Sequence, residues 1–526
     1  MSQVVEEVKS SAPKPVAVID IGSTSIRMAI AEIDPKGGVR TIETLSQAVS
    51  LGEDTFTKGS IDKNTIEECV QVLRSYCQLL AEYQIDKPEQ IRVVATSAVR
   101  EADNRLALLD RIYIATGLRV EPIDEAEENR ITYMGILPFL QSEPALGTAR
   151  TIIIEIGGGS TELLVVRNCN VLYAQSYRLG SLRLRETLEA YDVPGGKVRD
   201  FMVSQIERTV NQIREELLQE EAIEMIALGG DIRFATSQLL PDWRRNSLAR
   251  VPLPALEDFT DKLLELSADE LVRRYALSYP EAETLGPALL TYVQLAQAFN
   301  VVNVLVTNTN LRDGLLEEMA VGSVWSEEFA NQIIRSALDL GRKFHFDERH
   351  ARHVANLSRE LFQQLASEHA LEQRYAVILY IAALLHEVGL YVAYQSHHKH
   401  SMYLIRNSEL LGLGRKEVLL TALVARYYRR ASPQSNHEGY STLDRNERVA
   451  VSKMAAILRI AVALDDSRSQ RIPSISCELE PGRLILTAAD VQDLTLEQLA
   501  LRQSATLFED VFGLQVQLRP QRGEAR

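Results

Sequence analysis

Two glycine-rich segments of the sequence carry residue types that bind phosphate. Residues 151–166 read TIIIEIGGGSTELLVV, an apolar run followed by three glycines, a serine, a threonine and a second apolar run. Glycines allow a tight turn that brings N–H groups close to a ligand, and consecutive N–H groups with hydroxyls suit a phosphate. The carboxylates of Glu155 and Glu162 flank the turn and suit a divalent cation bound to that phosphate. The same pattern is typical of a β-hairpin whose glycines serve only the turn.

A second copy of the pattern favours the phosphate interpretation. Residues 18–30 read VIDIGSTSIRMAI, again an apolar run, an acid, a glycine turn with hydroxyls and a second apolar run. Three pairs of residues correspond at a constant offset of 135 positions: Asp20 with Glu155, Gly22 with Gly157, and Ser25 with Ser160. A repeat at this spacing predicts two related subdomains that hold one phosphate chain between two loops.

The elements between the loops predict further site residues. A strand over 91–96 leads into a strand–helix turn with Arg100, whose guanidinium either grips phosphate or lies on the surface. The acidic run 124–130 is typical of the first turn of a helix. One of its carboxylates is a candidate general base, because phosphoanhydride hydrolysis needs a group that deprotonates water. A further glycine turn at 229–233 follows a strand over 225–228.

Strands that alternate with helices predict an α/β fold with ligands at the carboxyl ends of the strands. After about residue 326 the sequence predicts only helices, and near the C-terminus a hairpin over 476–487 and one helix over 497–512. The predicted order is a disordered tail (1–15), two α/β subdomains (16–135 and 136–322), a helical domain (323–472) and a small α/β domain (473–526).

Composition is that of a globular protein in a reducing compartment. The 526 residues are 46% apolar and 25% charged, which is ordinary for soluble domains. The four cysteines form no CxxC pair, so neither a zinc site nor a disulfide framework is indicated. The N-terminus does not resemble a signal peptide, and the most apolar run, residues 375–385, is too short to cross a bilayer. We therefore expect a cytoplasmic protein without a membrane segment.

Charge is unevenly distributed. The net charge is −15, which argues against a general nucleic-acid binder. Residues 335–450 nevertheless carry a net charge of +4 and all nine histidines. This stretch predicts a polyanion-binding face, although a merely solvated surface is the simpler alternative. The face would consist of His397, His398, Lys399, His400, Arg406, Arg426, Arg429 and Arg430.

The histidine-rich stretch also contains a pattern of potential metal ligands. His353, His386, Glu387 and Asp465 are spread over several predicted helices. Clusters of this kind can bind metal. We favour the interpretation that these histidines are hydrogen-bonded within the protein or exposed on its surface.

Taken together, the motifs resemble one protein family. VIDIGSTSIRMAI, VVATSAVREADN, EAEENRITYMGI, IIIEIGGGSTELLVV, LGSLRL, ALGGDIR and TNLRDGLL occur in the order found in exopolyphosphatases and guanosine pentaphosphate phosphohydrolases, the Ppx/GppA phosphatases. The resemblance covers about residues 16–518. It implies duplicated actin-like (ribonuclease H-type) subdomains, an all-α HD-like domain and a small C-terminal α/β domain. It also implies a cytoplasmic homodimer that uses Mg²⁺, or Mn²⁺, and a lost metal site at the HD-like pair His386 and Glu387.

The resemblance assigns roles residue by residue. Glu128 takes the place of the glutamate that activates water, and Arg100 that of the phosphate-gripping arginine. The implied metal ligands are Asp20, Glu155 and Glu162. The implied phosphate ligands, besides Arg100, are Gly22, Ser23, Thr24, Ser25, Gly157, Gly158, Gly159, Ser160 and Gly230.

Three functions remain open at this point. The leading one is an exopolyphosphatase that removes terminal phosphate from inorganic polyphosphate. The second is a guanosine pentaphosphate 5′-phosphohydrolase, since the same loops serve both substrates. The third is a polyphosphate- or alarmone-binding protein with weakened hydrolysis. It is motivated by four departures from the family pattern, at Thr24, Asp124-Glu125, Glu155 and Asp231.

Overall fold

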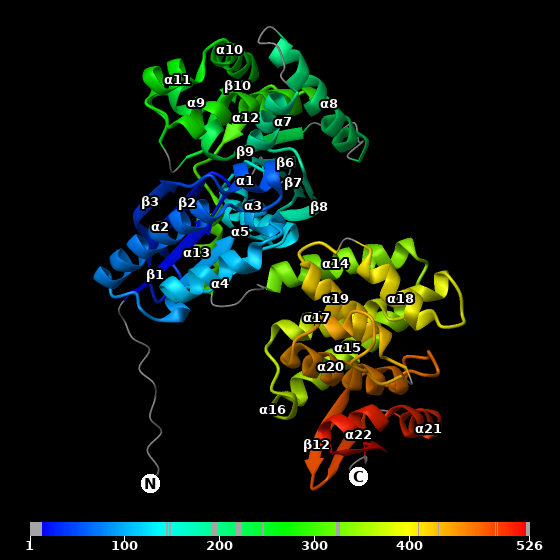
Figure 1. Cartoon of the computed structure of the whole chain (residues 1–526). Coiled ribbons are helices and arrows are strands. Elements are labelled where there is room, and N and C mark those ends of the chain that lie inside the picture. Colours follow the sequence, from blue (N-terminus) through cyan, green and yellow to red (C-terminus); the bar gives the residue numbers. More distant parts are fainter. Residues whose placement is uncertain are drawn as a thin grey trace. The chain divides into compact units, whose positions relative to one another are not determined.

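The structure is a computed structural model that describes most of the chain. The described residues are 13–143, 146, 149–191, 197–216, 223–244, 247–321, 327–408, 410–429, 431–489, 491 and 493–521. The predicted tail lies outside them up to position 12, and its last two residues already belong to β1 (Lys14–Ile21). The predicted boundary at 322–323 also lies outside them. The chain divides into two compact units, Met1–Ser323 (unit 1) and Val324–Arg526 (unit 2), each described by itself (Figure 1).

Unit 1 contains two sheets and the helices around them. The further strands are β2 (Ser25–Ile33), β3 (Val39–Ala48), β4 (Ile91–Ala95), β5 (Val120–Pro122), β6 (Arg150–Ile156), β7 (Thr161–Arg167), β8 (Asn170–Tyr177), β9 (Ile223–Leu228), β10 (Ala249–Pro252) and β11 (Asn303–Val306). The helices are α1 (Leu51–Lys58), α2 (Lys63–Glu82), η1 (Pro88–Gln90), α3 (Ser97–Glu101), α4 (Arg105–Thr116), α5 (Glu125–Ser142), α7 (Ser181–Ala190), α8 (Val198–Glu216), α9 (Gly230–Leu239), α10 (Leu253–Leu264), α11 (Ala268–Tyr275), α12 (Tyr279–Ala298) and α13 (Leu311–Val321).

The two sheets repeat one topology. The first has the order β3-β2-β1-β4-β5, and the second has the order β8-β7-β6-β9-β11, extended by β10. β1 pairs antiparallel with β2 and parallel with β4. In the same way, β6 pairs antiparallel with β7 and parallel with β9. The duplication predicted from the two loops is therefore present in the sheets.

Alternation along β1 determines which residues face the helices. Successive side chains of a strand point to opposite faces. Ala17, Ile19 and Ile21 pack in one core with α2 and α4, whereas Val16 and Val18 pack on the other face with α13. Helix α5 contacts α13 and also β7 and β8 of the second sheet. Helices α5 and α13 thus join the two sheets on the faces where the site residues lie.

Unit 2 is helical, with a small sheet near its C-terminus. Its helices are α14 (Glu327–Lys343), α15 (Glu348–Gln364), α16 (Ala366–His369), α17 (Arg374–Leu385), η3 (Val388–Tyr391), α18 (His397–Arg406), α19 (Arg415–Arg426), η4 (Tyr440–Thr442), α20 (Arg445–Leu464), α21 (Thr495–Ser504) and α22 (Thr506–Phe512). The sheet contains β12 (Ile475–Glu480), β13 (Arg483–Ala488) and β14 (Gln515–Pro520). The predicted hairpin is confirmed, because Glu480 pairs with Arg483 across a two-residue turn. The single helix predicted over 497–512 is wrong, since the chain forms α21 and α22 on either side of Ala505.

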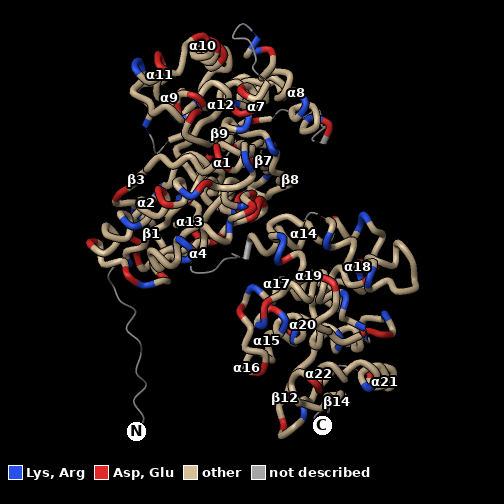
Figure 2. The backbone as a smooth tube through the Cα atoms, viewed as in Figure 1, with Lys and Arg blue, Asp and Glu red and all other residues tan. Residues whose placement is uncertain are grey.

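Helix α17 is the apolar centre of unit 2. It packs against α14, α15, α19 and α20. Among the described residues, the segment Arg374–Tyr391 has the length and hydropathy of a membrane span, but 72% of it is buried inside the protein. That burial is typical of a core helix. Acidic and basic residues are interspersed along the described backbone of both units (Figure 2).

Candidate active site

The two glycine loops have the same internal geometry. In the first loop (residues 22–25) the N–H of Gly22 donates to the carbonyl of Ser25 at 3.0 Å. In the second loop (residues 157–160) the N–H of Gly157 donates to the carbonyl of Ser160 at 2.8 Å. Each loop joins the two antiparallel strands that begin its sheet. The residues matched by sequence therefore occupy equivalent places.

The N-terminal end of α7 orients the second loop. The carbonyls of Gly157 and Gly158 accept hydrogen bonds from the N–H groups of Ser181 and Leu182, each at 3.0 Å. The carbonyl of Gly159 accepts from Arg183 Nε at 2.9 Å. Because the C=O and N–H of a trans peptide point in opposite directions, the N–H groups that follow these carbonyls point away from α7. The hydrogen bonds thus fix a row of donors of the kind that binds phosphate.

The two loops lie next to each other and to the start of α3. A Cβ atom added to Gly158 would lie 3.0 Å from Ser23 Cβ, and one added to Gly159 would lie 2.6 Å from Ser97 Oγ. The hydroxyls of Ser23 and Ser97 are 3.4 Å apart. A side chain at Gly158 or Gly159 would meet the side chain of Ser23 or Ser97, because the two loops and α3 lie close together here. The contact supports the prediction that both loops serve one ligand.

Three buried or partly buried acids line the same region. Asp20 lies on the face of β1 that packs against α13, where its Oδ2 accepts from Arg312 Nη1 at 3.3 Å. Its buried Oδ1 has no hydrogen-bond partner in the part of the chain that the structure describes. Glu155 Oε2 accepts from the Thr132 hydroxyl at 3.4 Å. Glu162 Oε1 accepts from the Ser160 hydroxyl at 2.5 Å.

Glu128 lies in the first turn of α5 and faces Arg100. Arg100 Nη1 is 3.0 Å from Glu128 Oε2 and donates to the Ile123 carbonyl at 2.9 Å, while Arg100 Nε is 3.4 Å from Glu125. The side chains of Arg100 and Glu128 are each only 12% exposed. The arginine expected to grip phosphate therefore holds the candidate base in this structure.

Burial raises the pKa values of the clustered carboxyls. It raises the pKa of Glu128 to about 7, with Arg100 acting in the opposite direction and Glu155 adding to the rise. Burial and the neighbouring Glu128 raise the pKa of Glu162 well above its ordinary value. Burial also raises the pKa of Glu155, which Arg233 opposes, and that of Asp231 to about 6, which Arg27 and Arg233 oppose. Packed acids of this kind are typical of functional sites and of cation-binding sites.

Three arginines complete the site and were missed by sequence reasoning. Arg27 follows the first loop on β2, Arg233 lies in the first turn of α9, and Arg312 begins α13. Arg233 Nη1 donates to the Thr309 carbonyl at 3.2 Å. Arg27 and Arg233 interact electrostatically with Glu155, and Arg312 interacts with both Asp20 and Glu155. Each arginine occurs in one of the motifs quoted above, shortly after the end of a strand. This position could have predicted that the arginines lie at the site.

The remaining predicted phosphate ligands lie at the edge of this cluster. Thr24 is partly buried, and its carbonyl accepts from the N–H of Val49 at 3.1 Å. Gly230 is exposed at the start of α9. The preceding Gly229 has the left-handed φ of 115°, and a Cβ there would lie 3.0 Å from the Tyr292 hydroxyl. The glycine that the turn requires is therefore Gly229, whereas Gly230 has space for a side chain.

Only part of the predicted polyanion-binding face lies on the surface of the protein. His397 is buried, its Nε2 hydrogen-bonded to the Tyr428 hydroxyl and its Nδ1 to the Tyr394 carbonyl, so this histidine was wrongly placed on the surface. Arg406 pairs with Glu438 at 2.8 Å. The other positions differ: His398, His400 and Arg426 are partly exposed, Lys399 and Arg429 are exposed, and Arg430 lies outside the described residues.

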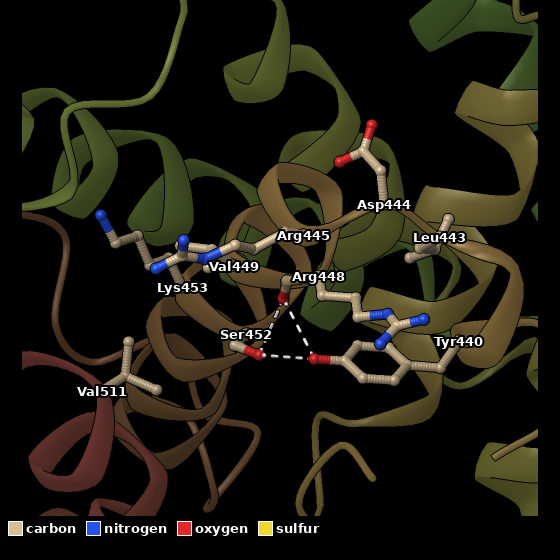
Figure 3. Close-up of a pocket in the computed structure, with 9 residues that line it drawn as sticks. All are labelled: Tyr440, Leu443, Asp444, Arg445, Arg448, Val449, Ser452, Lys453 and Val511. Carbon is tan, nitrogen blue, oxygen red and sulfur yellow. Dashed lines mark hydrogen bonds between the residues drawn. The ribbon is translucent and has the colours of Figure 1, made fainter. Parts of the chain in front are cut away.

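A cavity of about 610 Å³ in unit 2 has further basic side chains (Figure 3). Its lining residues are Tyr440, Leu443, Asp444, Arg445, Arg448, Val449, Ser452, Lys453 and Val511. The Tyr440 hydroxyl donates to the Arg448 carbonyl at 3.2 Å, and Arg448 itself donates to the Ser441 carbonyl at 2.8 Å. Lys453 Nζ donates to the His369 carbonyl at 2.6 Å. These cations lie in the first half of α20, and none of them belongs to the predicted polyanion-binding face.

Comparison with known proteins agrees with this architecture. A curated relative, the guanosine-5′-triphosphate,3′-diphosphate pyrophosphatase of Aliivibrio fischeri (strain MJ11), is 25% identical over 494 residues, which are 93% of each chain. The solved exopolyphosphatase of Cytophaga hutchinsonii has 20% identity and a TM-score of 0.53, covering 59% of this chain and 99% of that one. A solved exopolyphosphatase-like protein has 23% identity and a TM-score of 0.51, covering 58% and 97%.

The solved structures and the repeated sheet order confirm the predicted duplicated actin-like subdomains. The elements of unit 2 confirm the predicted helical region and the small α/β region after it. The family model described as Ppx/GppA phosphatase family matches residues 29–321. The model described as Ppx/GppA phosphatase, domain III, matches residues 334–507. Because the two matched regions span most of the sequence, the chain belongs to the Ppx/GppA phosphatase family.

Proposed function

We propose that this protein is an exopolyphosphatase that hydrolyses the terminal phosphoanhydride bond of inorganic polyphosphate. The observation that carries the proposal is the pair of loops with the same internal hydrogen bond, which lie next to each other beside a cluster of buried acids. Two such loops suit a chain of phosphates better than a single phosphate group. The name of the Cytophaga hutchinsonii structure supports the same activity.

In the proposed reaction Glu128 is the general base. Its pKa of about 7 makes the carboxylate both available and sufficiently basic near neutral pH. Water attacks the terminal phosphorus while the carboxylate accepts a proton from that water. The bond from phosphorus to the bridging oxygen breaks, and its electron pair remains on the shortened chain. When polyphosphate binds, before water attacks, Arg100 exchanges its contact with Glu128 for one with phosphate, and its guanidinium suits bidentate binding of phosphate.

We further propose that Asp20, Glu155 and Glu162 hold Mg²⁺, or Mn²⁺, in this site. The residues fit a hard divalent cation because Asp20 Oδ1 is buried without a described partner. Burial raises the pKa values of Glu155 and Glu162, and a neighbouring acid adds to each rise: Asp20 at Glu155, and Glu155 at Glu162. Such a cation would offset the negative charge of the phosphates.

A second candidate function is the hydrolysis of guanosine pentaphosphate. The relative from Aliivibrio fischeri, which is named for that type of substrate, matches 93% of the chain. The loops and Glu128 would act in the same way on the 5′ phosphate chain. The third candidate, a sensor with weakened hydrolysis, is motivated by the contact that Arg100 makes with Glu128 and by the family departures at Glu155 and Asp231.

One assay separates the three candidates. Phosphate release is measured from long-chain polyphosphate and from guanosine pentaphosphate at equal concentrations with Mg²⁺, and again with Mn²⁺. An exopolyphosphatase turns over polyphosphate faster, and Glu128→Gln lowers that rate by about 10²- to 10⁴-fold. Glu125→Gln, on the same helical turn and only 3.4 Å from Arg100, lowers it by less than about tenfold. Tight binding of polyphosphate without turnover would establish the sensor instead.

A further inference from the structure

Arg183 connects the second loop with helices that follow strands of the first sheet. It lies in the first turn of α7, which follows β8 of the second sheet. Its backbone N–H donates to the Gly158 carbonyl at 3.1 Å, and its Nε donates to the Gly159 carbonyl at 2.9 Å. Its Nη2 is 2.8 and 3.0 Å from the two carboxylate oxygens of Glu101, and its guanidinium carbon lies 4.1 Å from the centre of the Phe56 ring. This one side chain therefore contacts the second loop, α3 and α1 at the same time.

The two helices that Arg183 contacts also build the phosphate site. Glu101 is the last residue of α3 and directly follows Arg100, which binds phosphate in the proposed reaction. Phe56 of α1 lies against the second loop, since a Cβ atom added to Gly159 would be 2.4 Å from Phe56 Cζ. The contacts of Arg183 thus attach the end of α3 that carries Arg100 to the second loop.

The pair of Arg183 and Glu101 differs from an ordinary surface ion pair. Their side chains are 20% and 27% exposed, and two of the three guanidinium nitrogens of Arg183 already donate within the protein. Arg178 donates to the same carboxylate at 2.7 Å, but its side chain is 76% exposed. Within the described part of the chain, no hydrogen bond joins the Arg178 side chain to the second loop. Arg178 therefore shares the charge and the carboxylate of Arg183 but not its bridge between the subdomains.

We propose that Arg183 and Glu101 are positioning residues, which hold α3 and the second loop at the distance at which both loops contact one phosphate chain. This role rests on the exopolyphosphatase function proposed above and extends it to residues outside the acids and loops. A site whose parts are already held in place loses less conformational freedom when its ligand binds, so it binds more tightly. Without the pair, α3 and the second loop move apart, and Arg100 and the second loop no longer bind the same chain together.

The test is the binding of long-chain polyphosphate, with Mg²⁺, to the full-length chain. Every variant carries Glu128→Gln as well, so that binding is measured without turnover. Arg183→Lys keeps the charge, but lysine has no planar fork and cannot contact Gly159 and Glu101 together, so we expect a Kd at least about tenfold higher. Glu101→Ala should raise the Kd by a similar factor. Charge alone predicts the opposite sign, because removing a negative charge near a polyanion tightens binding.

Arg178→Gln is the matched control, because it removes an arginine from the same carboxylate without breaking the bridge. Its Kd should stay within about twofold of the background, as expected for an exposed pair. In the double variant Arg183→Lys/Glu101→Ala the loss should equal that of a single variant, since one contact can be broken only once. Background-like binding by Arg183→Lys, tighter binding by Glu101→Ala, or equal losses in Arg178→Gln and Arg183→Lys would overturn the proposal.

Turnover by the chain with Glu128 intact tests the proposed function separately. There Arg183→Lys should raise KM for long-chain polyphosphate more than it lowers kcat, because the pair acts on binding rather than on the proton transfer. Binding that depends on Arg183 without phosphate release would refute the exopolyphosphatase and retain the positioning role, whereas turnover with an unchanged KM in Arg183→Lys would refute the positioning role alone. A wild type that neither binds nor hydrolyses polyphosphate would refute both.

Discussion

Glu128 has an environment that determines the pH at which it can accept a proton. Burial raises its pKa to about 7, while Arg100 lowers it by a smaller amount. As the pH rises through about 7, the carboxyl ionises and becomes competent as a base. We therefore predict that kcat/KM for polyphosphate rises with pH between about 6 and 8. The measurement is the pH–rate profile at saturating Mg²⁺.

Asp231 provides the control for this profile. Burial raises the pKa of its carboxyl too, to about 6, and Arg27 and Arg233 are the nearby charges that oppose the rise. In Asp231→Asn the inflection near pH 7 should persist, because Glu128 is unchanged. A profile that becomes flat in this variant would assign the titration to Asp231 and would contradict the role given to Glu128.

Gly180 is a residue at which a single methyl group should disrupt the site. A Cβ there would lie 2.3 Å from the carbonyl oxygen of Gly158 and 2.5 Å from the carbonyl carbon of Gly159, and backbone atoms cannot move aside without moving the second loop. We predict that Gly180→Ala raises KM for polyphosphate and lowers kcat, each by about tenfold or more, since a shift of about an ångström in a site has effects of this size.

The matched substitution is Gly230→Ala. A Cβ at Gly230 meets nothing within 4 Å, and the residue begins a helix, where alanine is preferred to glycine. The melting temperature of the Gly230→Ala variant should equal or exceed that of the wild type, whereas that of Gly180→Ala should be lower. Wild-type kinetics in Gly180→Ala would show that the position of the second loop does not matter for turnover.

At the scale of elements, α5 carries Glu128 and is held by a buried ion-pair network. Glu318 on α13 contacts Arg92 Nη1 at 2.6 Å and Arg130 Nη2 at 3.0 Å. The side chains of Glu318 and Arg130 are 4% and 2% exposed. Removing one partner of a buried pair costs about 3–5 kcal/mol, because a charge is left buried without its counter-charge. Glu318→Gln should therefore destabilise unit 1 by about that amount and lower kcat through displacement of α5.

An exposed ion pair in unit 1, between β2 and β3, supplies the comparison for Glu318. Arg40 and Glu32 are 2.6 Å apart, but their side chains are 76% and 31% exposed. Exposed pairs contribute about 0–1 kcal/mol, so Glu32→Gln should change the free energy of unfolding by less than about 1 kcal/mol. Denaturant unfolding of both variants measures the difference. Equal losses would mean that burial does not determine the strength of these pairs.

The strands that were predicted from the sequence are more buried than a strand that was missed, β3. The strands β1 and β6 are almost continuously apolar, and each ends at a glycine turn, so both could be predicted from the sequence. The missed strands β3, β8 and β10 lie at or near sheet edges, where β3 exposes most of its side chains and lacks a clear alternation. For the site, the loops and acids were identified by repetition. Arg27, Arg233 and Arg312 were missed because their role depends on which acids the fold places beside them.

At the scale of the whole molecule, the two units should respond to pH in opposite directions. In unit 1 burial raises the pKa values of Glu128, Glu155 and Glu162 above their ordinary value of 4.5. The folded state then holds protons that the unfolded state releases, so stability falls as the pH rises from about 5 towards 8. In unit 2 burial lowers the pKa values of His369 and His398 below 6.5, so stability falls as the pH drops below about 6.5.

Calorimetry between pH 5 and 8 tests this prediction, with EDTA present to remove divalent cations. The transition of unit 1 should move to lower temperature as the pH rises, because the unfolded state releases the protons that the buried carboxyls hold in the folded state. Glu162→Gln should reduce that movement without affecting unit 2, and His398→Gln should reduce the opposite movement of unit 2. Mg²⁺ favours the ionised carboxylates and should therefore stabilise unit 1 most at the highest pH. A unit 1 transition that rises with pH in EDTA would contradict the burial of these acids, and with it the basis for Glu128 as a base near neutral pH.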